Sequence, residues 1–148
     1  MGLTRLAGFR SRHKRIALNT SVFIYQPEGN TRYVPLERPH HAAVTSTITM
    51  TEPLALPYRD SDEQRVNEFY SLLSTYPNLE WIAPSLEIAD IAARIRATHR
   101  LRTPDALQAA TAVWAKATGF VTNDNVFQRV SDFETLVLDE LLAAPAPG

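Results

Sequence analysis

Short apolar runs alternate with longer stretches of helical periodicity along this chain. Each run is three to five residues long and is bounded by polar residues. That pattern is typical of strands buried on both faces, because helices need longer periodic segments. The predicted strands are residues 15–18, 42–45, 79–83, 120–122 and 135–138.

Between the second and third runs, capping residues and 3.6-residue periodicity predict two helices. Ser46 is a candidate N-cap for a helix that continues to Leu56, and Asp60 or Ser61 is a candidate cap for the next. In the second of these helices the apolar side chains share one face: Val66, Phe69, Tyr70 and Leu73.

Two further helices are predicted between the third and fourth runs. The later one begins at Thr103 as a cap, has Pro104 at its first position and Asp105 in its first turn, and runs to Gly119. The earlier one follows Ser85, and its arginines lie outside its apolar stripe. That stripe consists of Ile88, Ile91, Ala92 and Ile95.

This alternation of strand and helix predicts an α/β fold, a three-layer α/β/α sandwich with a central parallel sheet of four or five strands. Right-handed crossovers bring the carboxyl ends of all strands to one edge of such a sheet. We therefore expect the chemistry at that edge, near the point where the strand order reverses.

Composition narrows the class of protein. A chain of 148 residues that is 45% hydrophobic fits one domain. The absence of cysteine suits a reducing cytoplasm and excludes thiolate chemistry. A net charge of −1 excludes a uniformly basic nucleic-acid binder, and no apolar run approaches the roughly 18 residues of a membrane span. We expect a cytoplasmic protein with a flexible basic arm at 1–14, a domain at 15–142 and a disordered tail at 143–148.

Polar clusters follow the predicted strands, where the carboxyl edge would gather them. Crowded carboxylates repel one another unless a cation neutralises them, and oxygen-only ligands favour Mg²⁺ or Mn²⁺. Such an ion can stabilise a phosphodiester and activate a water. The residues alone thus favour metal-dependent phosphoryl chemistry at four segments: Asn19-Thr20-Ser21, Ser46 with Glu52, Thr103-Pro104-Asp105 and Thr122-Asn123-Asp124.

At these residues the sequence resembles a known family. The segments RIALNTSVFIYQPEGNTRY, TSTITMTEPLALP, AARIRATHRLRTPDALQAATA and GFVTND occur in the order and spacing of the PIN-domain family. The likeness is closest to VapC-type toxins of bacterial toxin–antitoxin pairs and covers about residues 15–142. Its most distinctive pieces are RTPDALQAATA and TND.

The resemblance implies a Mg²⁺- or Mn²⁺-dependent endoribonuclease with an acidic quartet at the rim of a parallel sheet. It also implies a homodimer, a cognate antitoxin that plugs the site, and structured RNA of the tRNA or rRNA class as substrate. Carried onto this chain, the catalytic and metal-binding quartet is Asn19, Glu52, Asp105 and Asp124, with Thr122 as an orienting hydroxyl.

Three features depart from the family pattern. Asn19 stands where the family has Asp, so one negative charge is missing, and we expect weak or no metal binding and greatly reduced hydrolysis. The amide is either natural or an introduced change. Pro53 restricts the backbone of Glu52, which we expect at a kink or at the start of a helix. The stretch 34–43 is shorter than usual, which would alter the surface for pairing or antitoxin contact.

Basic side chains gather just before Asp105. A charge run is ordinarily a solvated face, and the i, i+4 spacing of Asp90 and Arg94 indicates a surface ion pair. Arg100 and Arg102 lead directly to the acidic rim, however, and we interpret them as candidates for contact with RNA phosphates. The histidines show no metal-ligand spacing and are expected at the surface: His13, His40, His41 and His99.

Two other classes of protein remain as alternatives. One is a non-catalytic PIN-like module that holds RNA or an antitoxin without cutting, which a divalent-ion titration would distinguish from the enzyme. The other is a receiver-type signalling module, which needs a Lys at a strand end. The only Lys beyond the N-terminal segment is Lys116, inside a predicted helix, and this disfavours the receiver.

Overall fold

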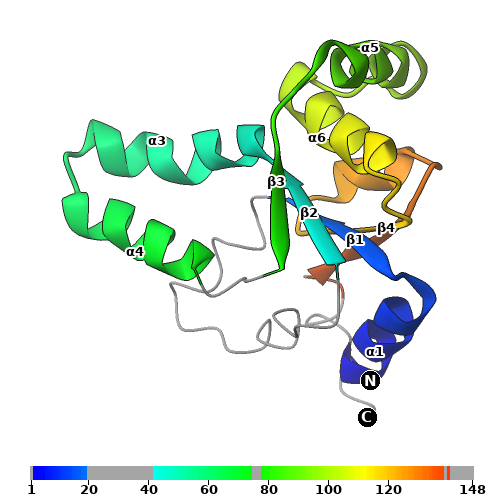
Figure 1. The fold of residues 1–148 in the computed structure, drawn as a ribbon, viewed down its shortest axis with the longest axis horizontal. Helices are drawn as coiled ribbons and strands as arrows, with labels where there is room; N and C mark the ends of the chain where they lie inside the picture. The colour runs from blue at the N-terminus through cyan, green and yellow to red at the C-terminus, as the bar shows by residue number, and fades with distance from the viewer. Residues whose placement is uncertain (1, 20–41, 75–77, 139, 141–148) are drawn as a thin grey trace.

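A computed structural model describes residues 2–19, 42–74, 78–138 and 140 of the chain, and they form a parallel sheet with helices around it (Figure 1). The expected α/β architecture is confirmed, with five strands. Their order across the sheet is β3-β2-β1-β4-β5, and all neighbours are parallel. The strands are β1 (Arg15–Leu18), β2 (Ala42–Ser46), β3 (Leu79–Ile82), β4 (Gly119–Thr122) and β5 (Glu134–Val137).

The strand order reverses between β1 and β4. From β1 the chain adds β2 and β3 on one side, and then returns to add β4 and β5 on the other. Leu18 of β1 is in register with Val121 of β4, so the carboxyl ends of these central strands lie next to each other. This is the place where open α/β sheets bind ligands.

Two apolar cores lie against the two faces of the sheet. Successive strand residues alternate between them: Ala17 and Phe120 belong to the first core, and Leu18 and Val121 to the second. The first core packs under α5 (Leu86–His99) and α6 (Thr103–Trp114), and the second contains side chains from α1 (Gly2–Arg12), α3 (Thr51–Arg59) and α4 (Glu63–Leu73). These layers form the expected sandwich.

The segment after β2 leads into a hairpin of two helices. Ser46 caps the 3₁₀ turn η2 (Thr47–Met50) through its hydroxyl, which accepts from the N–H of Ile48 at 3.3 Å, and α3 follows directly. The cap of α4 is Asp62, not the expected Asp60 or Ser61, because Asp62 Oδ1 accepts from the N–H of Arg65. The α3–α4 hairpin extends away from the sheet (Figure 1).

Helices α5 and α6 pack against each other beside the sheet (Figure 1). Ser85 caps α5 as expected, and the buried stripe consists of Ile88, Ala92 and Ile95, with Ile91 partly buried. Helix α6 ends at Trp114 rather than reaching Gly119, which instead begins β4.

The N-terminal segment differs from the expected flexible arm. Residues Gly2–Arg12 form helix α1, and the Phe9 side chain is 1% exposed. His13, expected at the surface, is buried as well. The apolar contact of Phe9 with the second core orders a segment that has little helical patterning of its own. The expected tail at 143–148 lies outside the described residues, as do His40, His41 and nearly all of the short stretch 34–43.

No helix in the described ranges is both long and apolar enough to traverse a lipid bilayer.

Candidate active site

Asn19 and Thr122 end the two central strands on the same face of the sheet. Each lies two residues beyond a side chain of the core under α5 and α6, so strand alternation directs both toward that layer. The N–H of Asn19 donates to the carbonyl of Val121 at 3.2 Å, which joins the two strand ends. Both side chains are buried, Asn19 at 6% exposure and Thr122 at 0%.

Asp105 reaches this region from the first turn of α6. Thr103 and Pro104 begin the helix, where proline needs no backbone hydrogen bond, and Arg102 occupies the cap position without a side-chain cap. The Asp105 side chain is buried, and its Oδ2 lies 3.6 Å from Nε of the exposed Arg102. A carboxylate in a first helical turn is favoured by the helix dipole.

The charge of Asp124 acts on the carboxyl group of Asp105. Burial raises the pKa of the Asp105 carboxyl above its ordinary value, and the negative charge of Asp124 raises the pKa further. The Arg102 guanidinium opposes both effects on this pKa. Two carboxylates from segments 19 residues apart therefore share one electrostatic environment, in which an additional cation would be stabilising.

The turn after β4 fixes the backbone around Asp124. Thr122 Oγ1 accepts from the N–H of Asp124 at 3.0 Å, and Asp124 Oδ1 accepts from the N–H of Val126 at 3.0 Å. Asp124 thereby caps the short 3₁₀ helix η3 (Asn125–Arg129). The Thr122 hydroxyl thus orders the turn that carries the aspartate, while the Asp124 carboxylate stays exposed.

Glu52 was expected at a kink or at the start of a helix, and it lies at the start of α3. Pro53 is the third residue of the helix, where a missing N–H breaks no intrahelical bond. The Glu52 side chain is exposed. Within the described ranges, no group of three or more Asp, Glu or His side chains could hold a metal ion, so the structure brings Asp105 and Asp124 together without adding Glu52.

Gln108 is a polar residue of this region that the sequence argument missed. It lies one turn after Asp105 on α6, is 5% exposed, and its Oε1 has no hydrogen-bond partner in the part of the chain that the structure describes. Leaving a buried amide oxygen unpaired costs about 1–3 kcal/mol. The signal was available, because Gln interrupts an otherwise alanine-rich buried face.

The donor set at the rim fits a hard divalent cation. Asp105 and Asp124 would offer carboxylate oxygens to such a cation, and Asn19 would offer an amide oxygen in place of a third charge. Such oxygens are the ligands that Mg²⁺ and Mn²⁺ prefer. These side chains fit the ion in the type of their oxygen atoms and in their position, but they carry less negative charge than three carboxylates would.

Some of the basic residues before Asp105 bind other protein groups, and others have exposed side chains. Arg94 pairs with Asp90 at 3.0 Å, as expected, and Arg96 Nε donates to the carbonyl of Leu101 at 3.2 Å. Arg102 has a side chain 80% exposed. Arg100 ends α5 in the left-handed conformation, with φ of 56°. Among these arginines, Arg102 contacts a rim carboxylate in the described part of the chain, so it marks the outer side of the site.

A parallel sheet whose strand order reverses beside two carboxylates is typical of α/β proteins that bind ligands at the carboxyl edge. The PIN-domain sequence profile matches residues 16–132, and the chain belongs to the PIN-domain family. PIN domains are typically metal-dependent nucleases. A comparison with curated protein sequences gave no match.

Solved structures with the same fold include toxin–antitoxin complexes. One is VapBC-1 from nontypeable Haemophilus influenzae, with a TM-score of 0.66 and 19% identity over 84% of this chain and 98% of that chain. Another is VapBC2 from Rickettsia felis bound to a promoter DNA fragment, with a TM-score of 0.64 and 20% identity over 82% of this chain and 97% of that chain. A toxin–antitoxin complex from Klebsiella pneumoniae has a TM-score of 0.63 and 23% identity over 83% of this chain and 97% of that chain. The predicted family resemblance is confirmed.

Proposed function

We propose that this protein is an endoribonuclease toxin of a toxin–antitoxin pair, which hydrolyses RNA phosphodiesters with Mg²⁺ or Mn²⁺ and is impaired by Asn19. The observation that carries the proposal is the buried carboxylate of Asp105, whose pKa is raised by burial and by the charge of Asp124, beside the reversal point of the sheet. Natural proteins tolerate such repulsion chiefly where it serves a ligand, and perturbed carboxylates in a site are functional candidates.

Each residue of the rim has a separate task in this proposal. Asp105, Asp124 and the Asn19 amide oxygen would hold the ion, and Glu52, exposed at the start of α3, would have to approach them when the ion binds. When bound, the ion supplies charge for the phosphate oxygens and an acidified water. Thr122 keeps the Asp124 turn in place through the hydrogen bond at 3.0 Å.

Arg102 and Arg100 would contact the RNA backbone beside the rim. The exposed Arg102 guanidinium lies at Asp105 in the free protein, and it can turn to a phosphate once a cation occupies the carboxylates. The substrate class would be structured RNA such as tRNA or rRNA. The partners would be a cognate antitoxin and a second copy of this chain, in the cytoplasm.

Restoring the missing carboxylate tests the enzymatic proposal. The Asn19→Asp variant is expected to cleave RNA in Mn²⁺ about 100-fold faster than the protein with Asn19, because a third carboxylate strengthens ion binding at the rim. The matched control is Asn19→Asp combined with Asp124→Asn, which keeps the number of rim charges of the unmodified protein and moves one of them from position 124 to position 19. No gain in Asn19→Asp, or the same gain in the double variant, would contradict the proposal.

A second candidate is a PIN-like module that binds RNA or an antitoxin without cutting. The observation in its favour is that the described residues contain no group of three acidic or imidazole side chains suited to a metal ion. This module should bind RNA equally in EDTA and in Mn²⁺, and Asn19→Asp should leave the RNA intact.

A further inference from the structure

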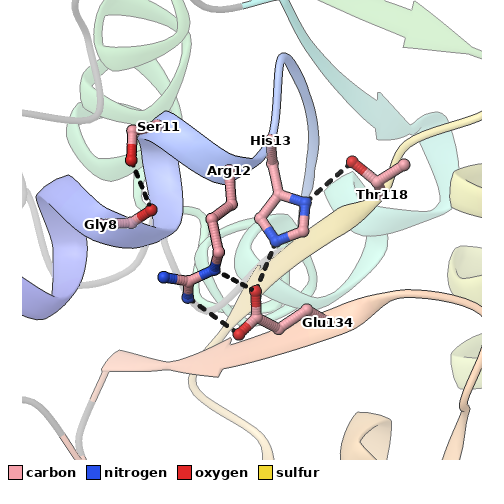
Figure 2. Close-up of polar contacts among 6 residues, drawn as sticks. All are labelled: Gly8, Ser11, Arg12, His13, Thr118 and Glu134. Atoms are coloured by element: carbon pink, nitrogen blue, oxygen red, sulfur yellow. Dashed lines mark hydrogen bonds and ion pairs between the residues drawn. The ribbon is translucent and has the colours of Figure 1, made fainter.

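A second polar cluster lies at the opposite edge of the sheet from the candidate active site. We call it the amino-edge clasp and define it as Arg12, His13, Thr118 and Glu134 (Figure 2). Its members come from the end of α1, from the residue preceding β4, and from the first residue of β5. The clasp therefore ties an N-terminal helix to two strands more than 100 residues away in sequence.

Glu134 is the centre of the clasp. Its carboxylate accepts from Arg12 Nε at 3.1 Å and from Arg12 Nη2 at 2.9 Å, a two-point pairing. His13 Nε2 lies 2.5 Å from Glu134 Oε1 (Figure 2). The hydrogen bonds from Arg12 and His13 lower the pKa of the Glu134 carboxyl. The groups around Glu134 favour its charged form.

His13 keeps its contacts in either protonation state. Its Nδ1 lies 2.8 Å from Thr118 Oγ1, and a hydroxyl can donate to a neutral imidazole or accept from an imidazolium. Nε2 can donate to Glu134 in both states. In the described part of the chain, the charged or titratable groups facing Glu134 are Arg12, the last residue of α1, and His13, which follows it. The uncharged Thr118, before β4, contacts His13.

An apolar contact brings α1 close enough for these bonds. The ring of Phe9 lies 4.6 Å from the ring of His13, measured between centroids, and Phe9 packs with the core around Ile16 and Leu18. Gly119 permits this approach, because a Cβ there would lie 2.6 Å from Phe9 Cζ. Helix α1 is thus fitted to the sheet edge, although it precedes the residues that match the PIN-domain profile.

We propose that α1 is an acid-released strap, closed by ionised Glu134 and opened when Glu134 gains a proton. Protonation of Glu134 removes the negative charge to which both Arg12 and His13 bind. Gain or loss of a proton on His13 alone leaves its bonds to Thr118 and Glu134 in place. Because α1 continues through Lys14 into β1, the closed strap also holds the strand that ends at Asn19. The proposal is independent of whether the opposite edge cuts RNA.

The direction of the pH effect follows from the lowered pKa of Glu134. The charged carboxylate supports the closed strap above the ordinary carboxyl pKa of 4.5, and this support is lost as the pH falls through the lower value of the folded protein. The strap should therefore stay closed at neutral pH and open only at a pH below the ordinary carboxyl pKa of 4.5.

Hydrogen exchange of the full chain tests the strap. In Glu134→Gln at neutral pH, amides of residues 2–14 should exchange about fivefold faster than in the unmodified protein, while residues 78–138 keep their protection. The unmodified protein should reach the same exchange once the pH falls through the lowered pKa of Glu134, after correction for intrinsic rates. The matched control is Glu80→Gln, which removes the ion pair with Arg15 at 2.8 Å but touches nothing on α1.

A second variant guards against misfolding. Arg12→Gln changes an exposed side chain and should speed exchange of residues 2–14 in the same direction as Glu134→Gln. Unchanged exchange of α1 in both variants would overturn the proposal, because Phe9 packing alone would then hold the helix. Equal acceleration in Glu80→Gln, or an α1 already unprotected at neutral pH, would overturn it as well.

Discussion

The two edges of the sheet place carboxylates in opposite electrostatic environments. At the amino edge, Glu134 is surrounded by donors that lower its pKa, so the cluster satisfies itself. At the carboxyl edge, Asp105 is buried near a second carboxylate, and its pKa is raised despite Arg102. A cluster that is complete within the chain is structural, whereas one whose charges repel needs something from outside. The difference separates the clasp from the candidate active site.

The largest expected effect concerns the close approach at the amino edge. Gly119→Ala should destabilise the protein by about 2–3 kcal/mol, because the new Cβ would meet the rings of Phe9 and His13 at 2.6 and 2.9 Å. Denaturant unfolding measures the loss. In a chain shortened to residues 14–148 the same substitution should have little effect, and an equal loss there would show that α1 is not the cause.

The next effect concerns RNA at the carboxyl edge. The double variant Arg100→Gln/Arg102→Gln should weaken RNA binding about tenfold. It should also make the plot of log K against log salt concentration less steep, by the amount expected for the loss of about one to two phosphate contacts. Binding across a series of salt concentrations measures both. The matched control is Arg94→Gln, whose side chain pairs with Asp90. An unchanged salt slope in the double variant would remove these arginines from the RNA surface.

A smaller effect has the opposite sign to most substitutions of buried residues. In EDTA at neutral pH, Asp105→Asn should stabilise the protein by about 1 kcal/mol, because it removes a buried charge that Asp124 repels. A raised pKa means that stability falls as the pH rises from the ordinary 3.8 through the value in the folded protein. The gain should therefore vanish at low pH in thermal unfolding. Destabilisation at neutral pH would show that Asp105 is satisfied without a cation.

The smallest effect sets the baseline for an ordinary surface ion pair. Asp90→Asn should change stability by less than about 0.5 kcal/mol, because Asp90 and Arg94 are 63% and 79% exposed in their side chains. Thermal unfolding at two ionic strengths measures it. A larger effect would mean that exposed pairs in this protein matter as much as the clasp does.

The sequence predicted the parts of the fold that local patterning controls. The apolar runs located five strands within a residue or so, and Ser46 and Ser85 were identified as caps because their hydroxyls bond to nearby N–H groups. The position of Asp105 in a first turn followed from Pro104, whereas the prediction of Thr103 as the cap was wrong, because Arg102 occupies that position without a side-chain cap bond.

Contacts between distant segments could not be predicted from those patterns. The docking of α1 depends on Gly119 and Glu134, which lie more than 100 residues from Phe9 and His13. Trp114 lies in the apolar run ALQAATAVWAKAT, which favours a core position, but its side chain is 43% exposed and donates from Nε1 to Glu87 at 2.8 Å. Apolar composition alone does not reveal a partner on a neighbouring helix. The roles assigned to Asn19, Glu52, Thr122 and the two rim aspartates remain predictions.

Ion-linked stability tests most directly whether the rim aspartates together form a cation site. Thermal unfolding should be measured in EDTA and in saturating Mn²⁺ for Asn19→Asp and for Asn19→Asp combined with Asp105→Asn and Asp124→Asn. Mn²⁺ at about 100 times its Kd should stabilise the first by about 2.7 kcal/mol and leave the second unchanged. The same stabilisation in both proteins, or none in Asn19→Asp, would contradict a metal site at this edge.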